Sequence, residues 1–233
     1  LFGVHFKRRL PGPLKNSYLR LERASEHAQP FLTGFEETDR IINGLHWLEV
    51  EAADNAPGAP LTLIPSYPDL PMEKVYPRVP QTAIAAVHLR QVGESRIVYF
   101  PWDVDRTFWE VLTPDHGQLL ANAIAWATNE ARPVTVTGPG LLDITIWRQA
   151  NSLTVHLVNL NNPMTMKGPY RELLPAPPQR VKIQVPPGMR VTGVQLLVGG
   201  ETIVAEEGDG WIEVMVPSVL DHEVIAVELE GVS

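Results

Sequence analysis

The chain has 233 residues, of which 44% are hydrophobic, and this is enough apolar material for one large or two ordinary domains. Acidic residues outnumber basic ones by 27 to 19, and the densest basic cluster is Lys7-Arg8-Arg9, which argues against a nucleic-acid or anionic-membrane surface. The chain has no cysteine, so disulfides, thiolate metal sites and a cysteine nucleophile are excluded.

The first residues of the chain and its longest apolar runs indicate where in the cell the protein is expected. No apolar run approaches the ~20 residues of a membrane span, so we expect no membrane-spanning segment. The chain opens on Leu1, with neither a Met nor a charged-then-apolar leader. We therefore expect a piece of a longer protein, with a cytoplasmic location.

Short strands and turns are predicted up to residue 90. The strand-like runs are residues 16–22, 45–52, 61–64 and 83–90, and residues 35–44 carry the acidic start of a short helix. Residues 65–80 hold five prolines among apolar side chains, which predicts an ordered excursion and not a linker.

The stretch over residues 96–129 organises the first half of the chain. A β-branched and aromatic run over residues 96–100 predicts a buried strand. A loop with two Trp and two Asp follows it, and residues 118–129 then repeat apolar side chains at the spacing of a helix that lies on a sheet. Strand, loop and covering helix are typical of the closing unit of an α/β layer.

From Pro133 onward the pattern is entirely β. Seven short runs alternate polar and apolar residues between Gly, Pro and Asn turns, as in an antiparallel β-sandwich. They are residues 134–137, 142–148, 152–159, 180–185, 193–198, 211–216 and 223–229. The predicted fold class is therefore α/β followed by all-β, with one domain over residues 1–131 and a second over residues 132–233.

Five segments resemble one group of bacterial multidomain glycoside-hydrolase-like proteins: residues 16–22, 34–38, 63–69, 96–103 and the His116-Gly117 helix start. The resemblance implies a flavodoxin-like domain, similar to the beta-galactosidase trimerisation domain and to class I glutamine amidotransferases, followed by a β-sandwich. Residues 1–131 would be the C-terminal half of that flavodoxin-like domain. The catalytic (β/α)8 barrel with its two carboxylates would lie upstream in the same polypeptide.

The loop after residue 100 holds the first candidate site residues. In an extended segment Asp103 and Asp105 would point the same way, so they could do acid–base work on a glycosidic bond or bind a hard cation. The simpler interpretation is that they cap the next turn and pair with Arg106. Trp102 and Trp109 could stack on a sugar ring, or they could anchor an interface, which we favour.

His116 is a further candidate site residue. His116 would need a nucleophile to act as a catalytic base, and no Gly-x-Ser-x-Gly elbow is present, so a capping or interface role is favoured. The seven histidines show no metal-ligand spacing, and we expect neither a metal nor a cofactor. The apolar loop over residues 163–170 predicts docking against another domain or chain.

The leading hypothesis is that this chain is the non-catalytic C-terminal portion of a glycoside hydrolase. Its partners would be the upstream barrel and further copies of the chain, without nucleic acid or membrane. The alternative is a carbohydrate-binding module that uses the loop with Trp102 and Trp109, or the face of the sandwich. A stand-alone amidotransferase or hydrolase is disfavoured, because cysteine and the elbow serine are missing.

Overall fold

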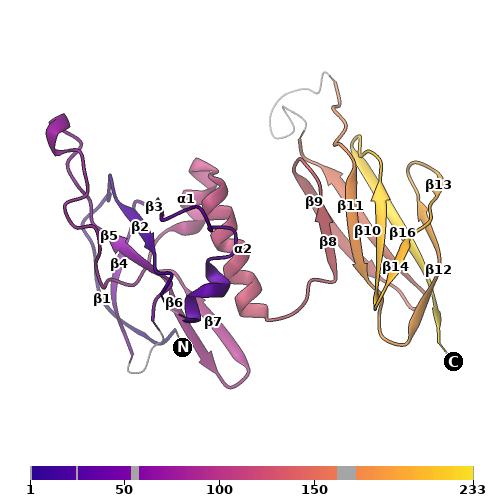
Figure 1. The fold of residues 1–233 in the computed structure, drawn as a ribbon, viewed down its shortest axis with the longest axis horizontal. Coiled ribbons are helices and arrows are strands. Elements are labelled where there is room, and N and C mark those ends of the chain that lie inside the picture. The colour runs from indigo at the N-terminus through magenta and orange to yellow at the C-terminus, as the bar shows by residue number, and fades with distance from the viewer. Residues whose placement is uncertain (1, 25, 54–57, 162–171, 233) are drawn as a thin grey trace. The chain divides into compact units, whose positions relative to one another are not determined.

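The computed structural model describes residues 2–24, 26–53, 58–161 and 172–232. The chain divides into two compact units, residues 1–130 and 131–233, and each is described by itself. All pairings between strands in the described part of the chain are antiparallel (Figure 1). None of its helices is long and apolar enough to cross a membrane.

Three small sheets make up the β part of the first unit. β2 (Tyr18–Leu21) lies between β3 (Arg40–Ile42) and β5 (Leu61–Ile64), and all of β5 is buried. A ribbon pairs β1 (Val4–Arg9) with β4 (Leu48–Ala52), and a hairpin pairs β6 (His88–Val92) with β7 (Ser95–Tyr99). Two 3-10 turns, η1 (Glu26–Phe31) and η2 (Met72–Lys74), complete this part.

Two helices close the first unit. They are α1 (Val104–Val111) and α2 (Pro114–Thr128), and each ends at a residue in the left-handed conformation, Leu112 and Asn129 respectively. Leu119 and Ala123 of α2 join the core, which is built on these fully buried side chains: Leu19, Phe31, Phe35, Ile41, Trp47 and Leu61.

The flavodoxin-like α/β layer is not what these residues show. Such a layer is built of parallel strands joined by crossovers, whereas β6 and β7 are joined by a tight turn at Gly93, which adopts a φ of 59°. Because the turn returns the chain beside the strand it has just left, the two strands must run antiparallel. The run predicted as a buried strand over residues 96–100 is accordingly only half-buried.

The loop predicted after residue 100 is largely helix α1. Asp103 occupies the N-cap position, Thr107 Oγ1 donates to the Asp103 carbonyl oxygen at 2.7 Å, and Arg106 pairs with Glu110 one turn later. Pairs spaced four residues apart stabilise a helix locally. Asp105, Arg106 and Trp109 therefore project from a helix and not from an extended loop.

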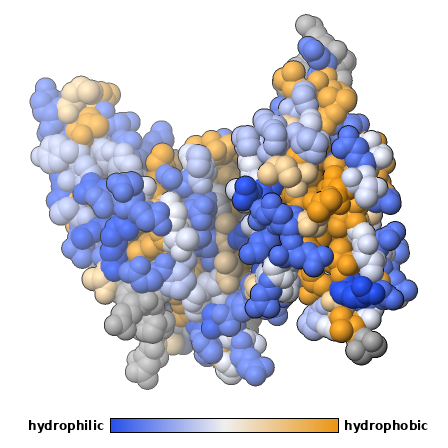
Figure 2. All heavy atoms as spheres, turned by 45° about the vertical axis from the view of Figure 1, so that its right-hand side comes forward, coloured by the Kyte–Doolittle hydropathy of each residue, from blue (hydrophilic) through white to orange (hydrophobic). Residues whose placement is uncertain are grey.

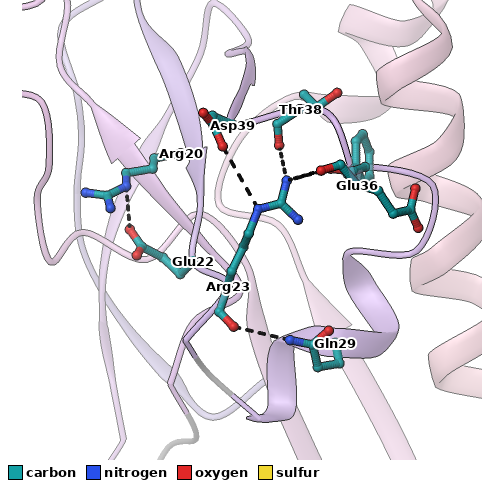
Figure 3. Close-up of polar contacts among 8 residues, drawn as sticks. Arg20, Glu22, Arg23, Gln29, Glu36, Thr38 and Asp39 are labelled. Atoms are coloured by element: carbon teal, nitrogen blue, oxygen red, sulfur yellow. Dashed lines mark hydrogen bonds and ion pairs between the residues drawn. The ribbon is translucent and has the colours of Figure 1, made fainter.

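The helix start predicted over residues 35–44 is wrong: residues 35–39 form a turn held by Arg23 (Figure 3), and residues 40–42 are strand β3. The Arg23 guanidinium donates to the carbonyl oxygens of Phe35 and Thr38, both at 2.6 Å, and to that of Glu36 at 3.3 Å. Backbone N–H groups of Gly34 and Glu36 hydrogen-bond the Glu36 carboxylate and lower its pKa. From helix α2, the side-chain NH2 of Asn122 donates to the backbone carbonyl oxygens of Phe31 and Thr33. Side chains thus satisfy the carbonyls that a helix would have paired.

The second unit packs two antiparallel sheets on one core. The five-stranded sheet has the order β13 (Glu201–Thr202), β12 (Met189–Leu196), β16 (His222–Gly231), β10 (Ser152–Asn159) and β9 (Leu142–Arg148). The four-stranded sheet has the order β14 (Glu206–Gly208), β15 (Trp211–Val216), β11 (Gln179–Gln184) and β8 (Val134–Thr137). Buried residues of both sheets form a single cluster, which confirms the all-β prediction for this half.

Asn159 ties the loops at one end of the sandwich together. Its side-chain NH2 donates to the carbonyl oxygens of Leu174 at 2.8 Å, Val219 at 3.0 Å and Leu220 at 2.8 Å. Its Oδ1 accepts from the backbone N–H and the side-chain amide of Asn161. The apolar loop predicted over residues 163–170 lies outside the described residues.

Candidate functional site

Trp102 belongs to the core of the first unit. It is 6% exposed, and its indole N–H donates to the Ala86 carbonyl oxygen at 3.0 Å. Its ring meets those of Phe100 and His116 edge-on, and its backbone bridges to Trp47. Because Trp102 is buried, it is not available to stack on a sugar beside Trp109, and it is not part of an exposed surface.

The Asp103 carboxylate fixes a backbone turn. Asp103 Oδ1 accepts the backbone N–H of His46 at 2.9 Å, and a side chain at Gly44 would collide with the same carboxylate and with Thr107. Asp105 is exposed in the first turn of α1, where a carboxylate is favoured by the helix dipole. The two carboxylates therefore stand in different environments.

Arg106 forms its ion pair with Glu110, and the charge of Asp103 acts on it as a smaller influence. Arg106 Nε lies 2.8 Å from Glu110 Oε1, and this hydrogen bond is the main reason that the pKa of Arg106 is raised. Both side chains are exposed, so the pair contributes little to stability.

His116 is a fully buried link between α2 and the sheet. Its Nε2 donates to the Ile42 carbonyl oxygen at 2.8 Å, and its Nδ1 lies 2.7 Å from Oγ1 of Thr113, the N-cap residue of α2. Since a carbonyl oxygen can only accept, Nε2 carries a proton. Both ring nitrogens are occupied, which leaves neither for a substrate or a metal.

Trp109 lies on the surface and starts an apolar patch. It is 71% exposed, and Val111 and Leu112 beside it are exposed as well. Leu112 follows directly on the last turn of α1, while Phe108 turns away from Trp109 and packs on Gly117 of α2. We refer to Trp109, Val111 and Leu112 as the α1 patch.

A second apolar surface lies on the arm over residues 65–82, drawn in purple in Figure 1. Leu70, Met72 and Tyr76 are exposed there, and Figure 2 shows hydrophobic residues at the surface of both units. The base of the arm is held where Tyr67 stacks on Tyr18, with ring centroids 6.2 Å apart. Exposed apolar side chains that are grouped in this way often mark a surface that contacts another molecule.

Sequence reasoning offered the face of the sandwich as an alternative sugar-binding surface but named none of its residues as site residues. Trp147 of β9 is 63% exposed, and His156 of β10 lies against His222 of β16, with His156 Nδ1 and His222 Nε2 3.2 Å apart. The alternation along residues 152–159 does predict that His156 faces away from the core. The register between strands, which brings the three rings onto one face, is not visible in the sequence.

Metal ligation has no support in either unit. No group of three His, Asp or Glu side chains is suitably placed among the residues that the structure describes. His88 is buried with Nε2 unpaired, and burial lowers its pKa. It is a neutral core histidine.

Comparison with solved structures finds glycoside hydrolases. An alpha-L-fucosidase isoenzyme 2 from Paenibacillus thiaminolyticus matches 98% of this chain with a TM-score of 0.73 and 15% identity. Gan42B, a GH42 beta-galactosidase from G. stearothermophilus, matches 97% with a TM-score of 0.51 and 11% identity. A beta-galactosidase from Bacillus circulans sp. alkalophilus matches 97% with a TM-score of 0.50 and 12% identity.

These likenesses concern the fold. The chain spans 34% of the fucosidase and 24% of each galactosidase, so it corresponds to a part of those proteins. No protein-family model matches the sequence, and the comparison with curated proteins gives no match.

Proposed function

We propose that this chain is a non-catalytic C-terminal portion of a glycoside hydrolase, which assembles copies of the protein and supports a catalytic barrel in the same polypeptide. The observation that carries the proposal is the match of both units together, over 98% of the chain, to one third of an alpha-L-fucosidase. The first unit would be part of the assembly domain that resembles the beta-galactosidase trimerisation domain, and the second unit its sandwich.

The placement of the acidic side chains supports a non-catalytic role. Glycosidases use two carboxylates that flank the scissile bond, whereas Asp103 holds the turn at His46 and Asp105 stands apart on α1. In the second unit, Glu223 is buried and accepts the backbone N–H groups of Val198, Gly199 and Val224. The carboxylates of Asp103 and Glu223 thus hold backbone, and a barrel elsewhere would supply the chemistry.

The α1 patch supports the assembly role. Exposed Trp is a common anchor of protein interfaces, and here it stands beside Leu112, a non-glycine residue at a φ of 55° that presents its side chain to solvent. We propose that a second copy of the chain covers this patch. The indole of Trp109 would supply most of the apolar area that the contact buries.

Light scattering on the purified chain tests the assembly role. We expect a mass of at least twice the 25.9 kDa of one chain, and a shift toward a single chain in Trp109→Ala. Trp147→Ala, which removes an exposed Trp from the second unit, is the matched control and should leave the mass unchanged. A wild-type chain that stays monomeric at every concentration would overturn this role.

Hydrolysis assays test the non-catalytic role separately. The chain should not cleave aryl fucosides or aryl galactosides. Cleavage that disappears in Asp105→Asn, a substitution at an exposed position, would show instead that the chain carries its own catalytic carboxylate.

A further inference from the structure

The outer face of the five-stranded sheet is defined by which side chains it leaves out of the core. Along β10, Leu153, Val155 and Leu157 are buried against the opposite sheet. Side chains alternate along a strand, so Thr154 and His156 point to the outer face. Residues paired in register share a face, and the same assignment therefore extends to β9 and β16.

The register places three rings on one diagonal. Trp147 of β9 pairs with Thr154, and His156 is two residues further along β10. His156 pairs with Val224, and His222 is two residues further in the same direction along β16. Diagonal neighbours of this kind are about 7–8 Å apart, within reach of aromatic side chains. Trp147, His156 and His222 thus form a line across three adjacent strands, which we call the ring diagonal.

Direct contacts order the second half of the ring diagonal. The rings of His156 and His222 are stacked, with centroids 5.4 Å apart and an angle of 20° between their planes. One of the two facing nitrogens donates to the other at 3.2 Å, and His156 Nε2 lies 3.4 Å from the Thr154 hydroxyl. Two flat rings are therefore held in place before any ligand arrives, which lowers the entropy cost of binding.

The neighbours of Trp147 in its row on the outer face of the sheet have small side chains. Its row across the sheet continues through Thr154 and Ala226, whose side chains are small, and reaches the longer Gln195 only on β12, three strands away. Small side chains leave one face of the indole open, in agreement with its exposure. An open indole face next to small side chains can receive the C–H face of a pyranose ring, because an aromatic ring carries partial negative charge on its face.

Hydrogen-bonding groups line both sides of the ring diagonal. Thr145 lies in the row of His156, Asp143 in the row of His222, and Glu228 lies two residues beyond Ala226 on the other side. A sugar hydroxyl both donates and accepts, and this set offers hydroxyls, imidazoles and carboxylates for it. The carboxylates also make the face unfavourable for an acidic ligand, in line with the net charge of −8.

We propose that the ring diagonal is a binding site for a neutral oligosaccharide, with one sugar unit stacked on Trp147 and the chain running toward His222. The site lies in the second unit and is independent of the α1 patch. The chain would then hold carbohydrate as well as assemble, and a barrel in the same polypeptide would act on glycans kept nearby.

Calorimetric titration of the full chain tests the site. The probes are a β-linked galactotetraose and a fucosylated tetrasaccharide, chosen because the matching structures are galactosidases and a fucosidase. We expect saturable heat with at least one of them, weakened at least tenfold in Trp147→Ala and several-fold in His156→Ala. Trp109→Ala is the matched control and should bind as the wild type does.

The other outcomes separate this site from the assembly role. No saturable heat at millimolar sugar, or binding that Trp147→Ala leaves intact, overturns the site even if the chain assembles. Tighter binding of a galacturonate tetramer than of either neutral sugar overturns the ligand class. A fall in mass by light scattering in Trp147→Ala overturns the proposal in favour of a protein contact on this face.

Discussion

Trp102 and Trp109 stand at the two ends of the same short segment and face opposite environments, because Trp102 donates to Ala86 inside the core while Trp109 lies on the surface. Helix α1 separates them: it begins after Trp102 and turns Phe108, not Trp109, toward α2. The core position supports the fold, and the surface position is free for contact.

The two tryptophans should therefore respond differently to truncation. Trp102→Ala removes a buried indole and leaves the Ala86 carbonyl without its donor, and we expect a loss of about 3–5 kcal/mol in the free energy of unfolding. Trp109→Ala should change it by less than about 0.5 kcal/mol in dilute protein, where assembly does not contribute. Urea unfolding followed by far-UV circular dichroism measures both. Equal losses would contradict the structure.

Asn159 is expected to be the most sensitive polar position of the sandwich. Asn159→Asp keeps the shape but places carboxylate oxygens against the carbonyl oxygens of Leu174, Val219 and Leu220. We expect a loss on the order of 3 kcal/mol at neutral pH, because the carboxylate oxygen that replaces the NH2 group would face three carbonyl oxygens and lack a donor. Asn151→Asp, at an exposed turn, is the control. Thermal unfolding that is the same in the two variants would rule out this role.

His88 should make stability depend on pH. Its pKa is lowered in the folded chain by burial, so the unfolded chain binds the proton first as the pH falls. The stabilisation is complete above the ordinary pKa of 6.5 and is lost as the pH drops below it. His88→Leu removes this titration and the unpaired Nε2, and its stability relative to wild type should rise between pH 7.5 and 5. Parallel pH profiles would contradict the assignment.

Arg23 should control the order of the turn over residues 31–39. Arg23→Ala removes the donor shared by Phe35, Glu36 and Thr38, and we expect a loss of about 1–2 kcal/mol. Amide exchange at Phe35 and Thr38, which close this turn on backbone carbonyls, should become faster. Arg20→Ala is the control, since the Arg20 guanidinium lies 3.9 Å from the half-buried Glu22 carboxylate and outside this turn. Unchanged exchange at both amides would show that Asn122 alone holds the turn.

Local patterns identified much of the second unit in advance. The alternating runs over residues 142–148 and 152–159 correspond to β9 and β10, because a strand with one buried face repeats its polarity every second residue. Only the very short β13 and β14 had no such signal, since two or three residues cannot show a period.

The first unit was harder to predict for a physical reason. The run predicted over residues 45–52 does contain β4, but β4 and its partner β1 form a largely exposed ribbon, and β3 has only three residues, so no polarity pattern marks these pairings. Helix α1 was missed because its signal lies in side-chain contacts such as Thr107 with Asp103 and Arg106 with Glu110. Such contacts arise only once the helix has formed.

Composition and local pattern by themselves determined that this chain carries no cysteine chemistry and that its second half is antiparallel β structure. Those properties depend on residue counts and on neighbours along the chain. Only the tertiary structure decided that Trp102 is core and Trp109 surface, and that Trp147, His156 and His222 share one diagonal. Strand register and helix orientation set these relationships, and both follow from packing between residues far apart in the sequence.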